Sequence, residues 1–206
     1  MGFISKLILP RQVDFDKALR AQAHQTARVV QDLYEVFVVC ESHTHSTIKH
    51  DAEKARSLKD NNMKELLNVF ITPYDKESIF RLITQLDWVA LSANHLELLA
   101  HAYSIDSMKN DEDILLELTQ MASLLDEGIA KLSAKTLHAI ADNCDRIHDK
   151  YDQVVFLCAR SLAALLQQED FRKTFIFRDI LAQLKEIAKR VHIAANTLED
   201  MMIKVV

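Results

Sequence analysis

The sequence predicts an all-α protein built from six long helices. Only two glycines and two prolines occur among its 206 residues, whereas a β-rich chain draws heavily on both for its turns. Apolar residues recur at helical spacing through most of the chain, as in helices that bury one face. Apolar residues make up 49% of the chain and charged residues 27%, which is ordinary for a globular protein. We therefore expect residues 1–206 to form one helical domain.

The first two helices are expected over residues 14–40 and from about residue 46 to Ile71. The polar stretch 41–46 between them predicts a break or kink. The second helix is highly charged in its first half and apolar in its second half. The first helix carries an apolar seam that strengthens toward its C-terminal end. The members of that seam are Phe15, Leu19, Gln22, Thr26, Val29, Leu33, Val36 and Phe37.

A helix stop followed at once by a helix start lies at Thr72-Pro73. Proline lacks an N–H and disfavours an α conformation in the residue before it, so the preceding helix must end near Ile71. Thr72 can cap the next helix, and Pro73 suits its first position. Asp75 stands three residues after Thr72, which is the spacing of a capping box. Thr72, Pro73 and Asp75 thus predict a tight structural corner.

Four helices are expected after this corner, over residues 73–103, 111–131, 133–168 and 173–203. The polar stretch 104–110 separates the first from the second, and Asn110 with Asp113 gives another capping pattern. Laying residues 79–86 on residues 177–184 makes the seams of the third and sixth helices coincide. The chain therefore reads as a pseudo-repeat of roughly 12–105 and 108–206.

Charge and cysteine content narrow the classes of function. The net charge of −5 leaves no basic surplus to neutralise phosphates, so we expect no nucleic-acid partner. The three cysteines show no CxxC spacing and are interpreted as buried thiols in a reducing compartment.

The segment 3–9 is apolar but too short for a signal-peptide core. We expect it to dock on its own bundle or on a sister subunit, with a membrane surface as the alternative.

The corner resembles the PhoU-like phosphate transport regulator family. The resemblance is carried by Phe70-Ile71-Thr72-Pro73-Tyr74-Asp75, the acidic helix start that follows and the pair Leu86-Asp87. It implies an all-α fold of two three-helix bundles and a role in phosphate homeostasis. These proteins are often associated with Pit-type inorganic phosphate transporters, so the resemblance also implies such a transporter as a partner.

The resemblance further implies metal-binding acidic pairs, spaced Glu/Asp-x-x-x-Asp, on helices two, three, five and six. Two carboxylates at i and i+4 share a helix face and suit iron or another divalent metal. The matching positions here are Ala52 and Arg56, Asp87 and Leu91, His148 and Asp152, and Lys185 and Lys189. Cations at such positions remove ligands and repel the ion, so we expect a metal-depleted member without a cofactor. If a metal does bind, its ligands are expected among Asp87, Asp149, Asp152 and His148.

Ion pairs are our hypothesis for what replaces the metals. Asp142, Asp145, Asp149 and Asp152 fall on one face of the fifth helix, and Lys185, Lys189 and His192 fall on one face of the sixth. The hypothesis is that these stripes, with Arg56 and Asp87 in the matching half, form ion pairs where relatives place metal. Its leading residues are Arg56, Asp145, Lys185 and Lys189. The alternative is that both stripes are solvated faces.

The sequence thus predicts a non-enzymatic cytoplasmic protein, peripheral to the inner membrane, that regulates phosphate transport by protein contact. It contains no GxSxG motif and no glycine-rich phosphate loop. Cys144 and Cys158 lie on an expected core seam and are interpreted as packing residues. Apolar chain ends predict a homo-oligomer. The alternative is a helical sensor that binds metal or phosphate.

Overall fold

The six expected helices are present. A computed structural model describes residues 13–39, 45–134 and 136–204, so Cys40, the segment 3–9 and most of the predicted break at 41–46 lie outside the described residues. The α-helices are α1 Phe15–Tyr34, α2 His45–Asn68, α3 Lys76–Ala102, α4 Glu112–Ala130, α5 Leu137–Leu165 and α6 Phe171–Ile203. A π-helix, Glu35–Val39, extends α1, and a 3₁₀ turn, Lys109–Asp111, precedes α4. No strand occurs in the described ranges, so the all-α prediction is confirmed.

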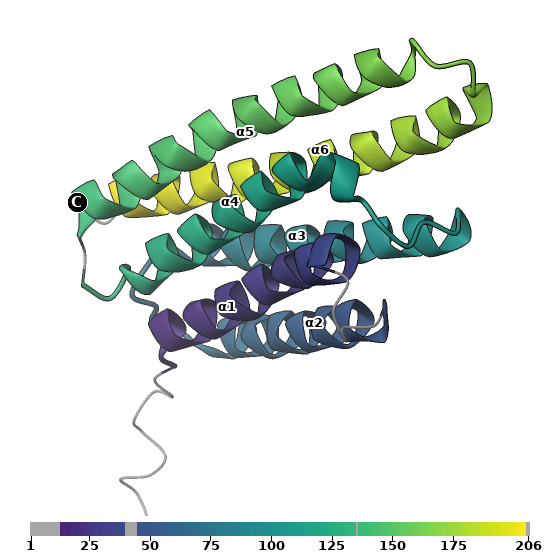
Figure 1. Ribbon diagram of the computed structural model, residues 1–206. Coiled ribbons are helices and arrows are strands. Elements are labelled where there is room, and N and C mark those ends of the chain that lie inside the picture. Colours follow the sequence, from purple (N-terminus) through teal and green to yellow (C-terminus); the bar gives the residue numbers. More distant parts are fainter. Residues whose placement is uncertain (1–12, 40–44, 135, 205–206) are drawn as a thin grey trace, which may run out of the picture.

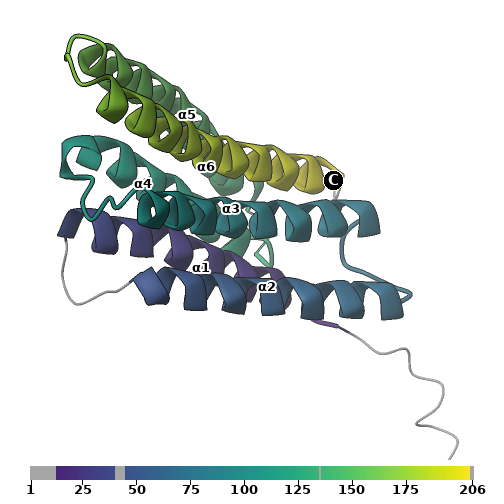
Figure 2. The ribbon, with the colours of Figure 1, turned by 90° about the vertical axis from the view of Figure 1, so that its right-hand side faces the viewer.

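The helices stack in three layers. The α5–α6 hairpin forms one outer layer, α1 and α2 form the other, and α3 and α4 lie between them (Figures 1 and 2). Within each half every helix packs on the other two, and the halves meet through α3 with α6 and α1 with α4. This arrangement is the expected pair of three-helix bundles. None of the described helices is long and apolar enough to cross a bilayer.

The two apolar seams that the sequence predicts on α3 and α6 are both buried in the core of the molecule. The buried residues on α3 are Ile79, Leu82, Leu86, Val89, Ala93 and Leu96, and those on α6 are Ile180, Leu184, Ile187, Val191, Ala194 and Leu198. The helices run antiparallel, since Arg81 pairs with Asp200 at 3.3 Å and the Gln183 amide donates to the Ser92 carbonyl at 2.8 Å. Burying these side chains stabilises the fold by about 1.5–3 kcal/mol each.

The corner between α2 and α3 differs from its predicted capping. Helix α2 ends at Asn68 rather than Ile71, and α3 begins at Lys76 with Asp75 as its N-cap. The Asp75 carboxylate accepts a hydrogen bond from the Ser78 N–H at 3.0 Å. The Thr72 hydroxyl instead donates to the Tyr74 carbonyl at 2.7 Å, so it is not free to cap the helix. Thr72 and Pro73 therefore shape the loop, and the prediction that Thr72 caps the helix is wrong.

The other helix boundaries shift by a few residues. The N-cap position of α4 is Asp111 and not the predicted Asn110. The buried Asp111 carboxylate accepts a hydrogen bond from the Ser161 hydroxyl at 2.8 Å. Helix α5 begins four residues later than predicted, at Leu137. The first helix ends as a π-helix from Glu35, which apolar periodicity does not distinguish from an α-helix.

Substituting the observed cap tests the corner. We expect Asp75→Ala to lower the melting temperature by about 2–4 °C, because it removes the acceptor for the first-turn N–H of α3. Thr72→Ala should lower it less, since Thr72 bonds only within the loop. Thermal unfolding followed by circular dichroism measures both. A larger loss for Thr72→Ala than for Asp75→Ala would favour the original capping assignment.

Candidate functional site

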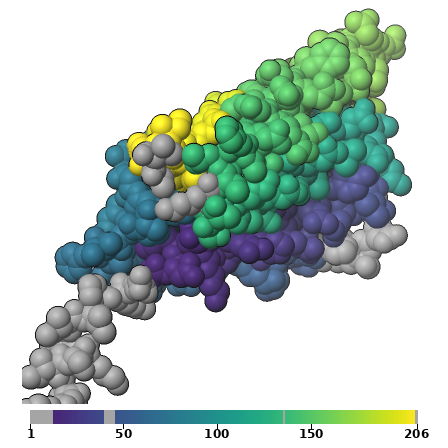
Figure 3. Space-filling model, turned by 90° about the vertical axis from the view of Figure 1, so that its left-hand side faces the viewer, coloured from purple at the N-terminus to yellow at the C-terminus, as the bar shows by residue number. Residues whose placement is uncertain are grey.

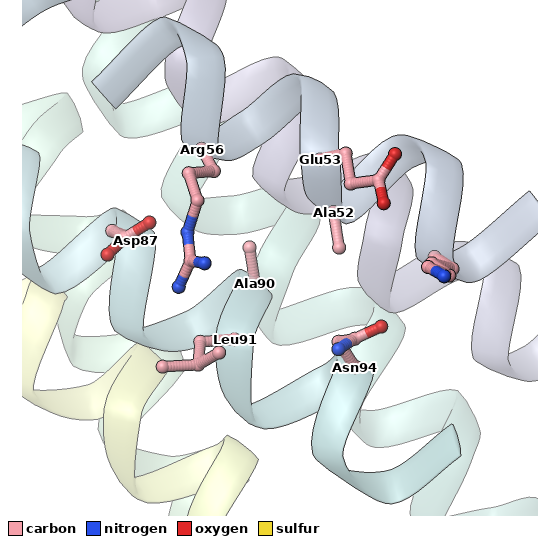
Figure 4. Close-up of a pocket in the computed structure, with 8 residues that line it drawn as sticks. Ala52, Glu53, Arg56, Asp87, Ala90, Leu91 and Asn94 are labelled. Carbon is pink, nitrogen blue, oxygen red and sulfur yellow. The ribbon is translucent and has the colours of Figure 1, made fainter. Parts of the chain in front are cut away.

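A small polar pocket lies between α2 and α3. Its volume is about 160 Å³, enough for a small ion with a few waters. The lining residues are Lys49, Ala52, Glu53 and Arg56 from α2 and Asp87, Ala90, Leu91 and Asn94 from α3. Figure 4 shows Arg56 and Asp87 close together at one end, Asn94 and Glu53 at the other, and the two alanines between them.

Helical spacing explains why these residues meet. Ala52 and Arg56 are one turn apart on α2, as are Asp87 and Leu91 on α3, so each pair occupies one helix face. These are the four positions in this half at which the family resemblance implies metal ligands, and the structure brings them together. The pocket is hollow because Ala52 and Ala90 fill little of the space between the helices.

The pocket is electrostatically mixed. Arg56 and Lys49 bring two positive charges, opposed by Asp87 and Glu53. Burial raises the pKa of Asp87 above its usual range, although the charges of Lys59 and Arg56 act in the opposite direction. The Asn94 side-chain oxygen is buried and has no hydrogen-bond partner among the described residues. A polar ligand or water in the pocket would satisfy it.

The residues of this pocket do not fit a resident metal ion. Ala52 and Leu91 have no donor atoms, and Arg56 places a permanent positive charge beside Asp87, which repels a cation. In the described part of the chain, no group of three or more His, Cys, Asp and Glu side chains is arranged to hold a metal. The donor set therefore agrees with the metal-depleted interpretation, although metal binding itself stays untested.

Aromatic rings occupy the corresponding place between α5 and α6. The ring centroids of His148 and His192 are 4.7 Å apart, and the Tyr151 ring lies at the same distance from His192. His148 Nε2 bonds to the side-chain oxygen of Asn196 at 2.8 Å. Burial and the neighbouring His148 lower the pKa of His192, against the charge of Asp152. Nδ1 of His192 is buried without a partner in the described residues.

The ion-pair replacement of the metal site stays a prediction. Asp145, Lys185 and Lys189 are exposed, and Arg56 is exposed at the mouth of its pocket. Within the ranges that the structure describes, none of these four residues has a salt-bridge partner. The rings of His148, Tyr151 and His192 take the space between the helices, so the charges stay at the rim in water. Asp149 and Asp152 are exposed as well.

A buried carboxyl pair between α1 and α2 escaped the sequence analysis. Asp32 is fully buried and Asp51 nearly so. Arg28 donates to Asp32 at 3.4 Å, and Lys54 donates to Asp51 at 2.7 Å. Burial, reinforced by the charge of Asp51, raises the pKa of Asp32 to about 6. Burial would also raise the pKa of Asp51, but the hydrogen bond from Lys54 brings it below its usual value. The sequence did contain a sign of this pair, because Asp32 stands three residues after Val29 and therefore falls on the same helix face as the apolar seam.

The cysteines are packing residues in the described part. Cys144 and Cys158 are buried and free. Burial raises the pKa of each thiol to about 12. A thiol with such a pKa is almost entirely protonated at neutral pH and is a poor nucleophile. This confirms the interpretation of both residues as core thiols.

Comparison with solved structures identifies the architecture. A PhoU-like protein from Shewanella oneidensis MR-1 superposes with a TM-score of 0.80 at 14% identity, covering 92% of this chain and 99% of that one. This chain has a PhoU-like fold. A second protein of that organism, described as a PhoU-like phosphate regulatory protein, gives a TM-score of 0.75 at 15% identity with the same coverage. The PhoU-like fold expected from the corner is confirmed.

The sequence comparison gives a full-length relative as well. The chain is 28% identical over 201 residues to the UPF0111 protein YkaA of Bacillus subtilis strain 168, covering 87% of this chain and 92% of the relative. No family model matches the chain. The sequence similarity to this relative therefore extends well beyond the corner.

The carboxyl pair makes stability depend on pH. The folded state raises the pKa of Asp32 from 3.8 to about 6, so it binds that proton more tightly than the unfolded state and loses stability as pH rises through 6. We expect the free energy of unfolding to fall by about 1 kcal/mol because of this residue when the pH is raised from 5 to 8. Asp32→Asn should remove that dependence.

Urea unfolding of wild type and Asp32→Asn at the two pH values measures the effect. Asp106→Asn, at an exposed acid, is the matched control and should keep the wild-type difference. An equal pH dependence in wild type and Asp32→Asn would contradict the raised pKa of Asp32.

Proposed function

We propose that this protein regulates inorganic phosphate transport by protein contact and without catalysis. The proposed partner is a Pit-type phosphate transporter, approached from the cytoplasmic side of the inner membrane. Support comes from the PhoU-like fold and from a neighbour described as a phosphate regulatory protein. The donor set of the α2–α3 pocket, which does not suit a resident metal, favours a role carried by the surface.

An exposed apolar patch at the corner carries the proposal. Leu67, Phe70 and Ile71 are 83%, 92% and 76% exposed. They lie within a stretch of five residues, while the neighbouring Leu66 and Val69 are buried and hold the patch in place. Side chains of this size gain free energy when a partner removes them from water, and such patches mark contact sites. We call Leu67, Phe70 and Ile71 the corner patch.

Phosphate uptake with a corner variant tests this function. In a strain that lacks the gene, we expect the wild-type chain to restore the phosphate uptake of the parent strain and to co-purify with the transporter. Phe70→Ser/Ile71→Ser should lose both effects because it removes the apolar contact without touching the core. Phe171→Ser/Phe175→Ser changes two exposed aromatics at the start of α6 and should behave as wild type.

The proposal fails if uptake in the strain without the gene equals that of the parent. It also fails if the corner variant restores uptake and binds the transporter as well as the wild type does. Melting temperatures of both double variants should equal that of the wild type, since all four side chains are exposed.

The second candidate function is a phosphate sensor, favoured by one observation. Arg56 and Lys49 meet the unpartnered Asn94 side chain in one pocket, and guanidinium and ammonium groups bind phosphate oxygens. We expect inorganic phosphate, but not sulfate, to raise the melting temperature if the pocket is a sensor site. Arg56→Ala should abolish this rise, whereas Lys64→Ala, at an exposed lysine of α2 outside the pocket, should preserve it. No rise with phosphate would exclude this function.

A further inference from the structure

One end of the molecule carries an open apolar cavity. It has a volume of about 500 Å³ and is lined by Leu137, Ile140 and Ala141 of α5 and by Glu199, Met202 and Ile203 of α6. Ile203 is 75% exposed at its rim. Figure 3 faces this end and shows the start of α1 (purple), the α2–α3 corner (blue), the start of α5 (green) and the end of α6 (yellow) on one surface.

The chain enters α1 close to this cavity. Helix α1 runs antiparallel to α4, because His24 bonds to Asp126 at 3.1 Å and Tyr34 bonds to Glu112 at 2.9 Å. Phe15 lies nine residues before His24, so the start of α1 is level with the connection that follows α4 and leads to Leu137. The cavity therefore lies at the same end of the bundle as the point at which residues 1–12 join the fold.

Those preceding residues match the cavity in chemistry. The segment 3–9, Phe-Ile-Ser-Lys-Leu-Ile-Leu, is apolar with one charge, that of Lys6. The cavity is apolar with one charge of opposite sign, that of Glu199. No salt-bridge partner of Glu199 lies in the described residues. Leu9 is four residues along the chain from Val13, a span of up to roughly 13 Å, and residues 3–9 extend the reach to roughly 35 Å.

The corner patch at the same end is a poorer match for this segment. Tyr74 bonds to Asp16 at 2.6 Å, so the corner lies equally close to the start of α1. Its nearby charges are of both signs, since Lys76, which donates to the Val69 carbonyl, stands between the exposed Asp75 and Glu77. The three side chains of the patch are largely exposed, whereas the cavity can bury several side chains.

We propose that residues 3–9 dock as an intramolecular strap in the apolar cavity between the start of α5 and the end of α6, with Lys6 paired to Glu199. The strap removes from water both the apolar side chains of the segment and those of the cavity. Intramolecular attachment gives it a high effective concentration at the cavity, so it outcompetes a second copy. The strap leaves the corner patch uncovered, and this inference does not depend on the proposed function.

Disulfide trapping in the full chain tests the strap. In a Cys40→Ser background, Leu7→Cys/Ile203→Cys should form an intrachain disulfide under mild oxidation, detected by peptide mass spectrometry and a monomeric band on a non-reducing gel. Leu7→Cys/Phe70→Cys is the matched control, since Phe70 is also an exposed apolar residue near the start of α1. We expect the control to cross-link roughly tenfold more slowly.

Two further sets of variants separate docking from chance encounter. Ala141→Trp fills the cavity and should abolish the cross-link, whereas Ala163→Trp, at an exposed alanine farther along α5, should not. Lys6→Glu or Glu199→Lys alone should reduce the yield by about two- to fivefold, and the combined charge exchange should restore it. Three results would overturn the proposal. They are equal yields of the disulfides to residues 203 and 70, a disulfide between two copies of the chain, and no disulfide to residue 203.

Discussion

The antiparallel packing of α3 on α6 is the constraint on which the rest of the structure depends. Both helices bury a continuous apolar seam, in which small residues such as Ala93 and Ala194 take part, and they meet through pairs such as Gln183 with Ser92. The remaining faces of the two helices are thereby directed toward α2 and α5. Asp87 and Leu91 come to line the α2–α3 pocket, and His192 comes to meet His148 across α5 and α6. The same packing sets the end of α6 beside the start of α3, where Arg81 pairs with Asp200.

Most of this architecture could be predicted from sequence because it depends on periodicity. The seams of α3 and α6 were visible in the spacing of apolar residues, and i,i+4 spacing placed Arg56 and Asp87 correctly on facing helix surfaces.

The capping of α3 could not be predicted in the same way. Thr72 and Asp75 are both good caps, and only the bond from Thr72 to the Tyr74 carbonyl decides between them. Asp32 was missed because a carboxylate normally indicates a solvated position, whereas here Asp51, Arg28 and Lys54 accompany it. The contents of the space between α5 and α6 could not be predicted either, because the sequence does not reveal that the rings of His148, Tyr151 and His192 meet there.

The chain thus combines a PhoU-like fold with sites of a different chemical character from those that the family resemblance implies. Arg56 and Leu91 stand where carboxylates were expected, and the facing pocket is hollow, polar and mixed in charge. Features suited to contact gather instead at one end of the bundle, where the corner patch is exposed and the apolar cavity opens. Our central claim is that the fold serves recognition at this end, and that a bound metal has no part in it.

Elemental analysis of the native protein tests that claim most directly. The full chain would be purified without a chelator or an affinity tag and examined by mass spectrometry for iron, manganese and zinc. Our account predicts far less than one equivalent of any of these metals per chain. Stoichiometric iron that is lost on replacing Asp87, Asp149 or Asp152 with alanine would contradict it, because those carboxylates would then act as ligands despite the neighbouring cations.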